Sequence, residues 1–305
     1  MMWLSLAFTV GSAGFNATMH MVTKREGASL AFFAYLLTVA SFVSLVGTRL
    51  VTPLSFSALS PVFFAWTAGT MLGEMLYALG LRFAYRTLDL SVVYPMTRAL
   101  PILFLAVVTT AFGFGKPISP RGALGLLMVC GGSLMVPLRS FSELRLPGRI
   151  DRRFGFVLLA AVGITIRTLC DSQGLAELID TATESGMSLP RPLFALAFCA
   201  FRSTPIMVCF WLAALSTRNV RRETFSLLRR CFGASLRAAI CDTATTLLLF
   251  AAMAFATNVS FVQAFRQIGL LFGLAEAVFI LKEPCTAPKV AGTVTILAGV
   301  LLSVL

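Results

Sequence analysis

Two arginines stand inside apolar stretches that are long enough to cross a lipid bilayer, and an acid precedes each of them at the same distance. Arg98 follows Glu74 by 24 residues, and Arg266 follows Asp242 by 24 residues. A guanidinium near the middle of a membrane costs at least ~2.5 kcal/mol, so it persists only beside a polar cavity or an acid. Because guanidinium groups bind carboxylates and phosphonates, this doubled arrangement predicts a site for a small anion near the membrane centre.

The two acids, Glu74 and Asp242, have more than one interpretation. They hold the arginines in place, or they take up protons as the site opens alternately to each side of the membrane. His20 is the only histidine, and histidine titrates near neutral pH, which makes it a third candidate for proton coupling. A structural interpretation competes with all of these: the charges form buried salt bridges that join helices and contact no substrate.

Further polar residues share helix faces with these charges, because residues three, four and seven positions apart lie on one side of a helix. Arg167 and Asp171 add another arginine and acid, four residues apart, in a later apolar stretch. Pro95 and Pro101 flank Arg98 and indicate either a bend that opens the backbone or the ordinary use of proline in membrane helices. The predicted substrate-binding residues are Arg98, Arg266, Glu74, Asp242, Tyr94, Tyr77, Gln263, Gln267 and Asn16.

The composition is that of a polytopic membrane protein. The chain has 305 residues, of which 58% are hydrophobic and 12% charged, whereas soluble proteins carry about 25% charged residues. The net charge of +12 fits basic cytoplasmic loops better than nucleic-acid binding. The seven cysteines include no CxxC, which argues against a disulfide framework or a metal site. The sequence predicts no cofactor and a location in the plasma or inner membrane.

Ten stretches meet the criterion of ~20 mostly apolar residues for a spanning helix. The predicted fold class is therefore an all-α polytopic membrane protein with ten transmembrane helices. The stretches are 2–22, 29–50, 61–82, 90–112, 119–138, 154–175, 191–216, 233–256, 258–281 and 287–305.

The polar segment 139–153 separates two blocks of five stretches, 1–138 and 154–305. The offset of 168 residues that relates the two acids and the two arginines also places Phe104 on Phe272. After a gap of one residue, further matches are Pro117 with Pro284, Gly125 with Gly292 and Gly132 with Gly299. Because five is odd, a duplicated block inserts the second time upside down. The sequence thus predicts two inverted five-helix repeats, an arrangement found in many secondary transporters.

The loop charges predict the orientation. Loops after odd-numbered stretches carry sixteen Lys and Arg residues, and loops after even-numbered stretches carry four. Since basic loops stay on the cytoplasmic side, both termini are expected outside, with the segment 139–153 in the cytoplasm and the acidic segment 176–190 outside.

Several motifs of the chain resemble one family. The first block contains YPMTRALPILF at 94–104 and ISPRGALGLLMVCGGSLMV at 118–136, and the second contains FVQAFRQIGLLFGL at 261–274, LKEP at 281–284 and KVAGTVTILAGVLL at 289–302. In these motifs the chain resembles an EamA-type member of the drug/metabolite transporter superfamily. The resemblance implies a central cavity formed by helices one to four and six to nine, with helices five and ten at the periphery. It departs from the family pattern at Gly115-Lys116, where Gly-Glu is usual.

The predicted function is a secondary-active transporter or exporter of a small polar or anionic metabolite, with protons as one candidate for the coupling ion. The sequence has no P-loop, so ATP is not expected to drive it directly. A lipid-linked carrier or flippase remains an alternative, as does a membrane scaffold that transports nothing. One histidine, no HxxxH, no GxSxG and no clustered aspartates argue against an enzyme. The expected partners are a small-molecule substrate and the lipid bilayer, with the chain as a monomer or homodimer.

Overall fold

The computed structural model describes residues 2–26, 30–54, 59–88, 90–136, 138, 140–144, 154–216, 222, 232–269 and 286–304. Every regular element within these ranges is a helix, so the all-helical prediction is confirmed for this part of the chain. The elements are α1 (Met2–Glu26), α2 (Leu30–Val51), α3 (Pro61–Thr87), α4 (Leu90–Phe112), α5 (Pro120–Met135), the short 3-10 helix η2 (Phe141–Leu144), α6 (Phe154–Glu184), α7 (Arg191–Ser216), α9 (Phe232–Phe255), α10 (Val259–Phe265) and α12 (Ala287–Val304).

Five of the described helices contain segments long and apolar enough to cross a membrane. These segments are Pro61–Leu81, Phe154–Glu184, Arg191–Leu212, Leu236–Phe255 and Ala287–Val304. Shorter apolar helical segments are Met2–Phe15, Tyr35–Val51 and Met96–Phe112. The chain is therefore compatible with a membrane protein, as its composition predicts. The count of ten spans in two inverted repeats stays a prediction.

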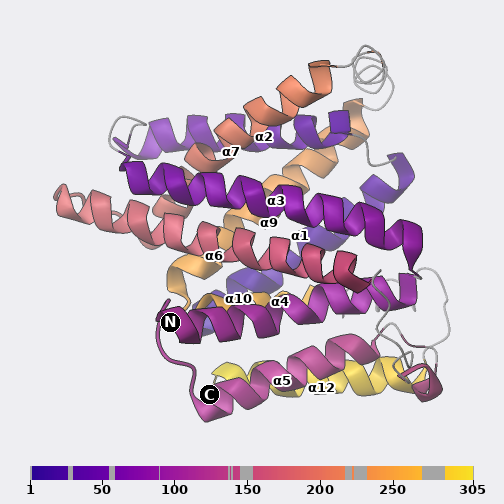
Figure 1. Cartoon of the computed structure of the whole chain (residues 1–305). Coiled ribbons are helices and arrows are strands. Elements are labelled where there is room, and N and C mark those ends of the chain that lie inside the picture. The colour runs from indigo at the N-terminus through magenta and orange to yellow at the C-terminus, as the bar shows by residue number, and fades with distance from the viewer. Residues whose placement is uncertain are drawn as a thin grey trace. The chain divides into compact units, whose positions relative to one another are not determined.

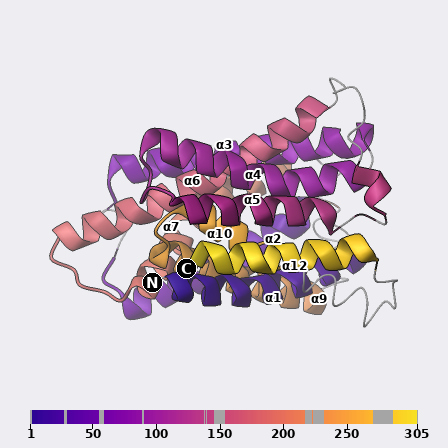
Figure 2. The same cartoon turned by 90° about the horizontal axis from the view of Figure 1, so that it is seen from below.

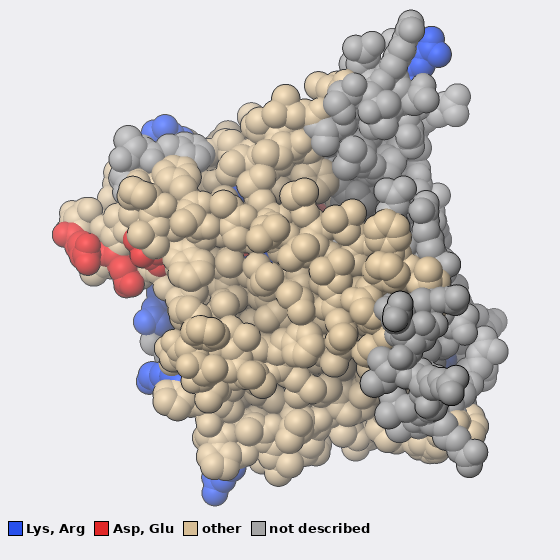
Figure 3. All heavy atoms as spheres, viewed as in Figure 1, with Lys and Arg blue, Asp and Glu red and all other residues tan. Residues whose placement is uncertain are grey.

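The surface of α3 separates apolar from polar residues. Leu72, Met75, Leu79 and Phe83 fall on one stripe and are between 40% and 62% exposed, and the surface around α3 in Figure 3 belongs almost entirely to uncharged residues. Such a stripe suits a lipid environment, where apolar side chains lose nothing by exposure.

The described chain divides into two compact units, each built from separated segments. Unit 1 consists of Met1–Leu6, Ala65–Gln173 and Ala256–Leu305, and unit 2 consists of Ala7–Phe64 and Gly174–Phe255. Helices α1, α3 and α6 thus contribute to both units. The predicted division into 1–138, 139–153 and 154–305 follows the chain order and stays a prediction.

Unit 2 is held together by α2, α7 and α9, which all pack against one another. The Trp211 indole N–H of α7 donates to Thr38 Oγ1 of α2 at 2.7 Å. Phe198 of α7 forms an edge contact with Phe250 of α9, their ring centroids 4.8 Å apart. The Ser12 hydroxyl of α1 donates to the Thr245 carbonyl of α9 at 2.9 Å, so α1 joins this group through a buried polar contact.

In unit 1 the loop before α5 is fixed to the start of α10 by one side chain. Asn258 is the N-cap of α10, and its Oδ1 accepts from the Ser260 N–H at 2.9 Å. Its amide nitrogen donates to the Lys116 carbonyl at 3.2 Å, while the Lys116 N–H donates to the Thr257 carbonyl at 2.9 Å. Gly115 has φ +83° and lies against Thr257. The loop that departs from the family pattern is therefore held through its backbone, by the Asn258 side chain and by the Thr257 carbonyl.

Helix α6 is longer than the sequence predicted. The segment 176–184 was expected in a loop, because it contains three acids, but it continues the helix to Glu184. Leu175, Leu178 and Ala182 recur on one face and are buried, which gives the extension an apolar anchor. Gly186, at φ +76°, then ends the helix. The Met187 N–H donates to the Ala182 carbonyl and the Gly186 N–H to the Thr183 carbonyl, the bonds of a Schellman motif.

Helices α5 and α12 lie side by side in both views of the cartoon (Figures 1 and 2), and glycines let their backbones touch. A Cβ added at Gly132 would lie 2.6 Å from the Gly292 carbonyl oxygen, whereas one added at the neighbouring Gly131 would meet nothing within 4 Å. Close contact through small residues is a common way for membrane helices to associate.

This contrast predicts opposite effects for two adjacent substitutions. Gly132→Ala should lower the free energy of unfolding by about 1–3 kcal/mol, because α5 and α12 must move apart. Gly131→Ala should leave it unchanged or raise it by up to ~1 kcal/mol through helix propensity. Thermal unfolding of the purified protein in detergent measures both, and equal effects at the two positions would contradict the packing described.

Candidate functional site

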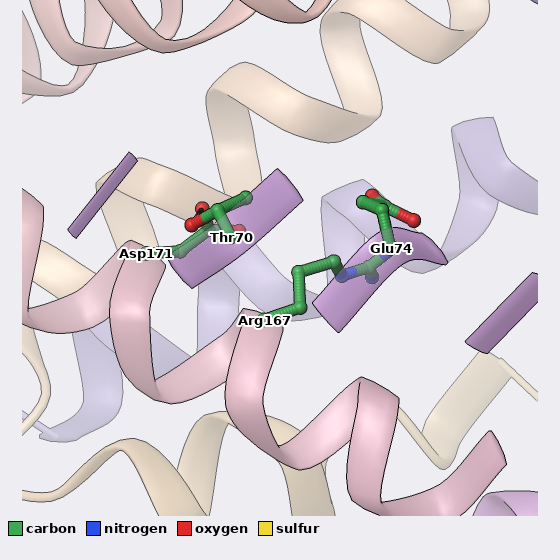
Figure 4. A network of polar contacts seen from close by, with 4 residues as sticks. All are labelled: Thr70, Glu74, Arg167 and Asp171. Atoms are coloured by element: carbon green, nitrogen blue, oxygen red, sulfur yellow. Dashed lines mark hydrogen bonds and ion pairs between the residues drawn. The ribbon is translucent and has the colours of Figure 1, made fainter. Parts of the chain in front are cut away.

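The best-defined polar contacts within unit 1 join α3 and α6. The Arg167 guanidinium donates to Glu74 Oε1 at 2.8 Å, with the two side chains 20% and 27% exposed. One turn away, the Thr70 hydroxyl donates to Asp171 Oδ1 at 2.8 Å. Figure 4 shows Thr70 and Glu74 on α3 facing Arg167 and Asp171 on α6. The spacing of four residues on each helix aligns the two contacts along antiparallel helices.

Glycines bring α3 and α6 close enough for these short side chains to meet. A Cβ at Gly73 would lie 2.6 Å from the Arg167 backbone nitrogen, and Gly163 is pressed in the same way against the backbone of Tyr77. With the backbones in contact, Thr70 reaches Asp171 directly. The polar contacts therefore depend on the absence of side chains at Gly73 and Gly163.

Arg98 and Arg266 extend this polar contact into a cluster. The Arg266 guanidinium is within electrostatic reach of the charges of Arg167, Arg98 and Glu74, and of the Tyr77 phenol. All five side chains are only partly buried. With Asp171, which acts on Arg167, the cluster brings together three guanidinium groups and the carboxylates of Glu74 and Asp171. Guanidinium groups gathered in this way favour an added anion.

Arg266 stands where the backbone of α10 changes its hydrogen bonding. The helix ends at Phe265. The Arg266 N–H still donates to the Val262 carbonyl four residues back, whereas the Gln267 N–H donates to Ala264 O and the Gly269 N–H to Arg266 O, three residues back, each at 3.0 Å. The prediction of one continuous helix from 258 is therefore wrong at Arg266. Helix α4, by contrast, continues through both prolines that flank Arg98, so the break lies on the other arginine-bearing segment.

The side chain of Gln267 replaces the backbone bond that the break removes. In a regular helix the Gln263 carbonyl would accept the Gln267 N–H, but here it accepts the Gln267 side-chain Nε2 at 3.3 Å. The same Nε2 lies 3.3 Å from the Arg98 backbone carbonyl and donates to it. Gln267 thus ties the turn at Arg266 to α4 at Arg98.

A separate group of polar residues lies within unit 2. Cys199 of α7 is fully buried, and the charges of Arg202 and Asp242 both act on it. The Arg202 guanidinium lies 5.5 Å from the Phe250 ring centroid, a distance suited to a cation–π contact. Asp242 and Arg202 thus both act on Cys199 within this unit. The predicted pairing of Asp242 with Arg266 joins residues of different units and stays a prediction.

The structure brings together most of the predicted residues that belong to unit 1. Arg167, Asp171 and Thr70 belong to the cluster but were missing from the predicted substrate-binding set. The sequence did carry a signal for Arg167, because Arg167 interrupts an apolar stretch just as Arg98 and Arg266 do.

In the described part of the chain, no three His, Cys, Asp or Glu side chains gather as a metal-ligand set. The predicted residues whose side chains lie outside the described part are Tyr94, Asn16 and His20.

Comparisons with known proteins identify the fold alone. No family model matches the sequence, and neither does any curated protein. Among solved structures, 28 chains match. One of them, described as "Crystal structure of protein", has a TM-score of 0.65 and 14% sequence identity, and the match covers 98% of this chain and 96% of that chain. An experimentally determined protein therefore shares this helical fold over nearly its whole length.

The Glu74–Arg167 contact predicts strong coupling between the two residues. Glu74→Gln or Arg167→Gln should each cost about 1–3 kcal/mol, because each removes a 2.8 Å ion pair in a largely buried position. The double variant should cost less than the sum of the two by at least ~1 kcal/mol. Denaturant-induced unfolding in mixed micelles provides the four values, with Glu184→Gln at the exposed end of α6 as a control near zero. Additive losses would show that the two groups do not interact.

Proposed function

We propose that this chain is a secondary-active transporter that moves a small anionic metabolite by alternating access. In this proposal it is an EamA-type member of the drug/metabolite transporter superfamily, with ten spanning helices in two inverted repeats of five. It resides in the plasma or inner membrane, carries no cofactor and performs no chemical conversion of its substrate.

The observation that carries the proposal is the cluster of Arg98, Arg167 and Arg266. The three guanidinium groups come from α4, α6 and the turn after α10, and Arg266 is within electrostatic reach of the other two. Guanidinium groups gathered in apolar surroundings can bind an anion between them.

The ion pair between Glu74 and Arg167 offers a route for coupling to protons. A proton on Glu74 would remove its charge and release Arg167 to the anion, so that substrate and proton favour each other. Asp242, whose charge acts on Cys199, is the second candidate, and His20 is the third. Each of the three is a proposal about coupling and not about the anion site itself.

The anion site predicts a specific loss of transport. In liposomes, uptake of the small carboxylate or phosphonate that the wild type accumulates best from a labelled panel should fall at least about tenfold in Arg98→Ala and in Arg266→Ala, as expected when a charge-assisted hydrogen bond is lost. Arg121→Ala, which removes an exposed arginine at the start of α5, should transport normally. Normal uptake by folded Arg98→Ala and Arg266→Ala proteins would refute the anion site.

Labelling of single added cysteines tests the proposed orientation of the chain in the membrane. A membrane-impermeant maleimide added to intact cells should label Glu184→Cys at the exposed end of α6 and leave Ser142→Cys in η2 unlabelled until the cells are opened. The wild type, with its native cysteines, sets the baseline. Labelling of Ser142→Cys alone from outside would reverse the orientation.

A further inference from the structure

The amide group of Gln267 has a defined orientation. Its nitrogen faces two carbonyl oxygens, those of Arg98 and Gln263, at 3.3 Å each. Turning the amide over would place its oxygen against both carbonyls, where no donor is present. The oxygen Oε1 therefore points away from them and is fixed as an acceptor.

This acceptor has no partner among the residues that the structure describes. Gln267 is 1% exposed, and its Oε1 is buried without a hydrogen bond. Gln263, one turn earlier and 3% exposed, has an Oε1 in the same condition. Buried acceptors without a donor are costly and uncommon in folded proteins. Gln267 follows Arg266 in the chain and its Nε2 donates to the Arg98 backbone carbonyl, so a ligand of the arginine cluster is the candidate for the missing donor.

A simple anion would bind the arginines of this site but would leave Gln267 Oε1 without a hydrogen-bond donor. The guanidinium groups of Arg98, Arg167 and Arg266 donate hydrogen bonds and accept none, and a carboxylate or phosphonate accepts from them. Gln267 Oε1 needs the opposite, a group that donates. A neutral hydroxyl suits this acceptor better than an ammonium, because the three guanidinium groups would repel an ammonium.

We propose that the substrate of this site is a small hydroxylated anion, whose anionic group binds the arginines and whose hydroxyl donates to Gln267 Oε1. This inference rests on the proposed function, because it assigns the substrate class of the same site. Gln267 is then the residue that distinguishes a hydroxy acid from the acid without the hydroxyl.

Binding measurements on the purified protein in detergent test the hydroxyl directly. The probes are L-lactate, L-alanine and propionate, together with 2-hydroxyethylphosphonate and ethylphosphonate, and Kd is obtained from ligand-dependent thermal stabilisation. Each hydroxylated probe should bind at least about tenfold more tightly than its partner without the hydroxyl, because the latter leaves Oε1 unpaired. L-Alanine should bind no better than propionate.

Substitutions assign the preference to Gln267. In Gln267→Met, which keeps the length of the side chain and removes the acceptor, the hydroxylated and plain probes should bind equally. Gln173→Met, the same change at a half-buried position of α6, should keep the wild-type preference. The ratio of two dissociation constants is the readout, because a merely structural effect of the substitution weakens both probes alike.

The outcomes separate this inference from the proposed function. Equal binding of both members of each pair by the wild type, with both lost in Arg98→Ala, would overturn the hydroxyl assignment and leave the anion site standing. Tighter binding of L-alanine than of L-lactate, or an unchanged preference in Gln267→Met, would also overturn it. Binding that is absent, or indifferent to Arg98→Ala, would refute the anion site and the inference with it.

Discussion

The free-energy cost of removing a guanidinium group from water determines where the charged side chains of this chain can lie. Lipid offers no hydrogen bonds, so every charged side chain in an apolar helix must find its partners inside the protein. Arg167 meets this requirement through Glu74 and Asp171, and all three arginines of the cluster are only partly buried. The same requirement explains why the outer stripe of α3 is apolar while its inner stripe carries the acid.

Backbone geometry makes that cluster possible. Contact between α3 and α6 at Gly73 and Gly163 lets short polar side chains reach across, and a glycine at each close approach has no side chain to keep the helices apart. The turn after α10 then places Arg266 outside regular helix. Gln267 compensates for the lost backbone bond and at the same time holds α4. The residues that set the helix packing and the turn are therefore the same residues that position the polar side chains.

The sequence predicted the all-helical character of the described chain, because long apolar stretches are a strong signal for helices. It did not predict the partners: a repeated spacing of 24 residues says nothing about which helices are neighbours, and the Arg167 contact to Glu74 depends on how α3 meets α6. The end of α6 resembled a loop because it is acidic, although its buried apolar face sustains a helix. The prolines beside Arg98 pointed to a bend in α4 as one of two interpretations, but the helical hydrogen bonding breaks at Arg266. The sequence did not show this, because a side chain that replaces a backbone hydrogen bond, as that of Gln267 does, leaves no recognisable pattern.

The central claim is that the arginine cluster faces a water-filled space inside the membrane, and accessibility of α3 measures this most directly. Nitroxide labels at Tyr77→Cys, within the cluster, and at Met75→Cys, which is 62% exposed on the apolar stripe, would be compared in liposomes by electron paramagnetic resonance. The account predicts that a water-soluble nickel reagent collides with the label at 77, while oxygen dissolved in lipid collides with the label at 75. A label at 77 that is shielded from nickel and as open to oxygen as the label at 75 would contradict it.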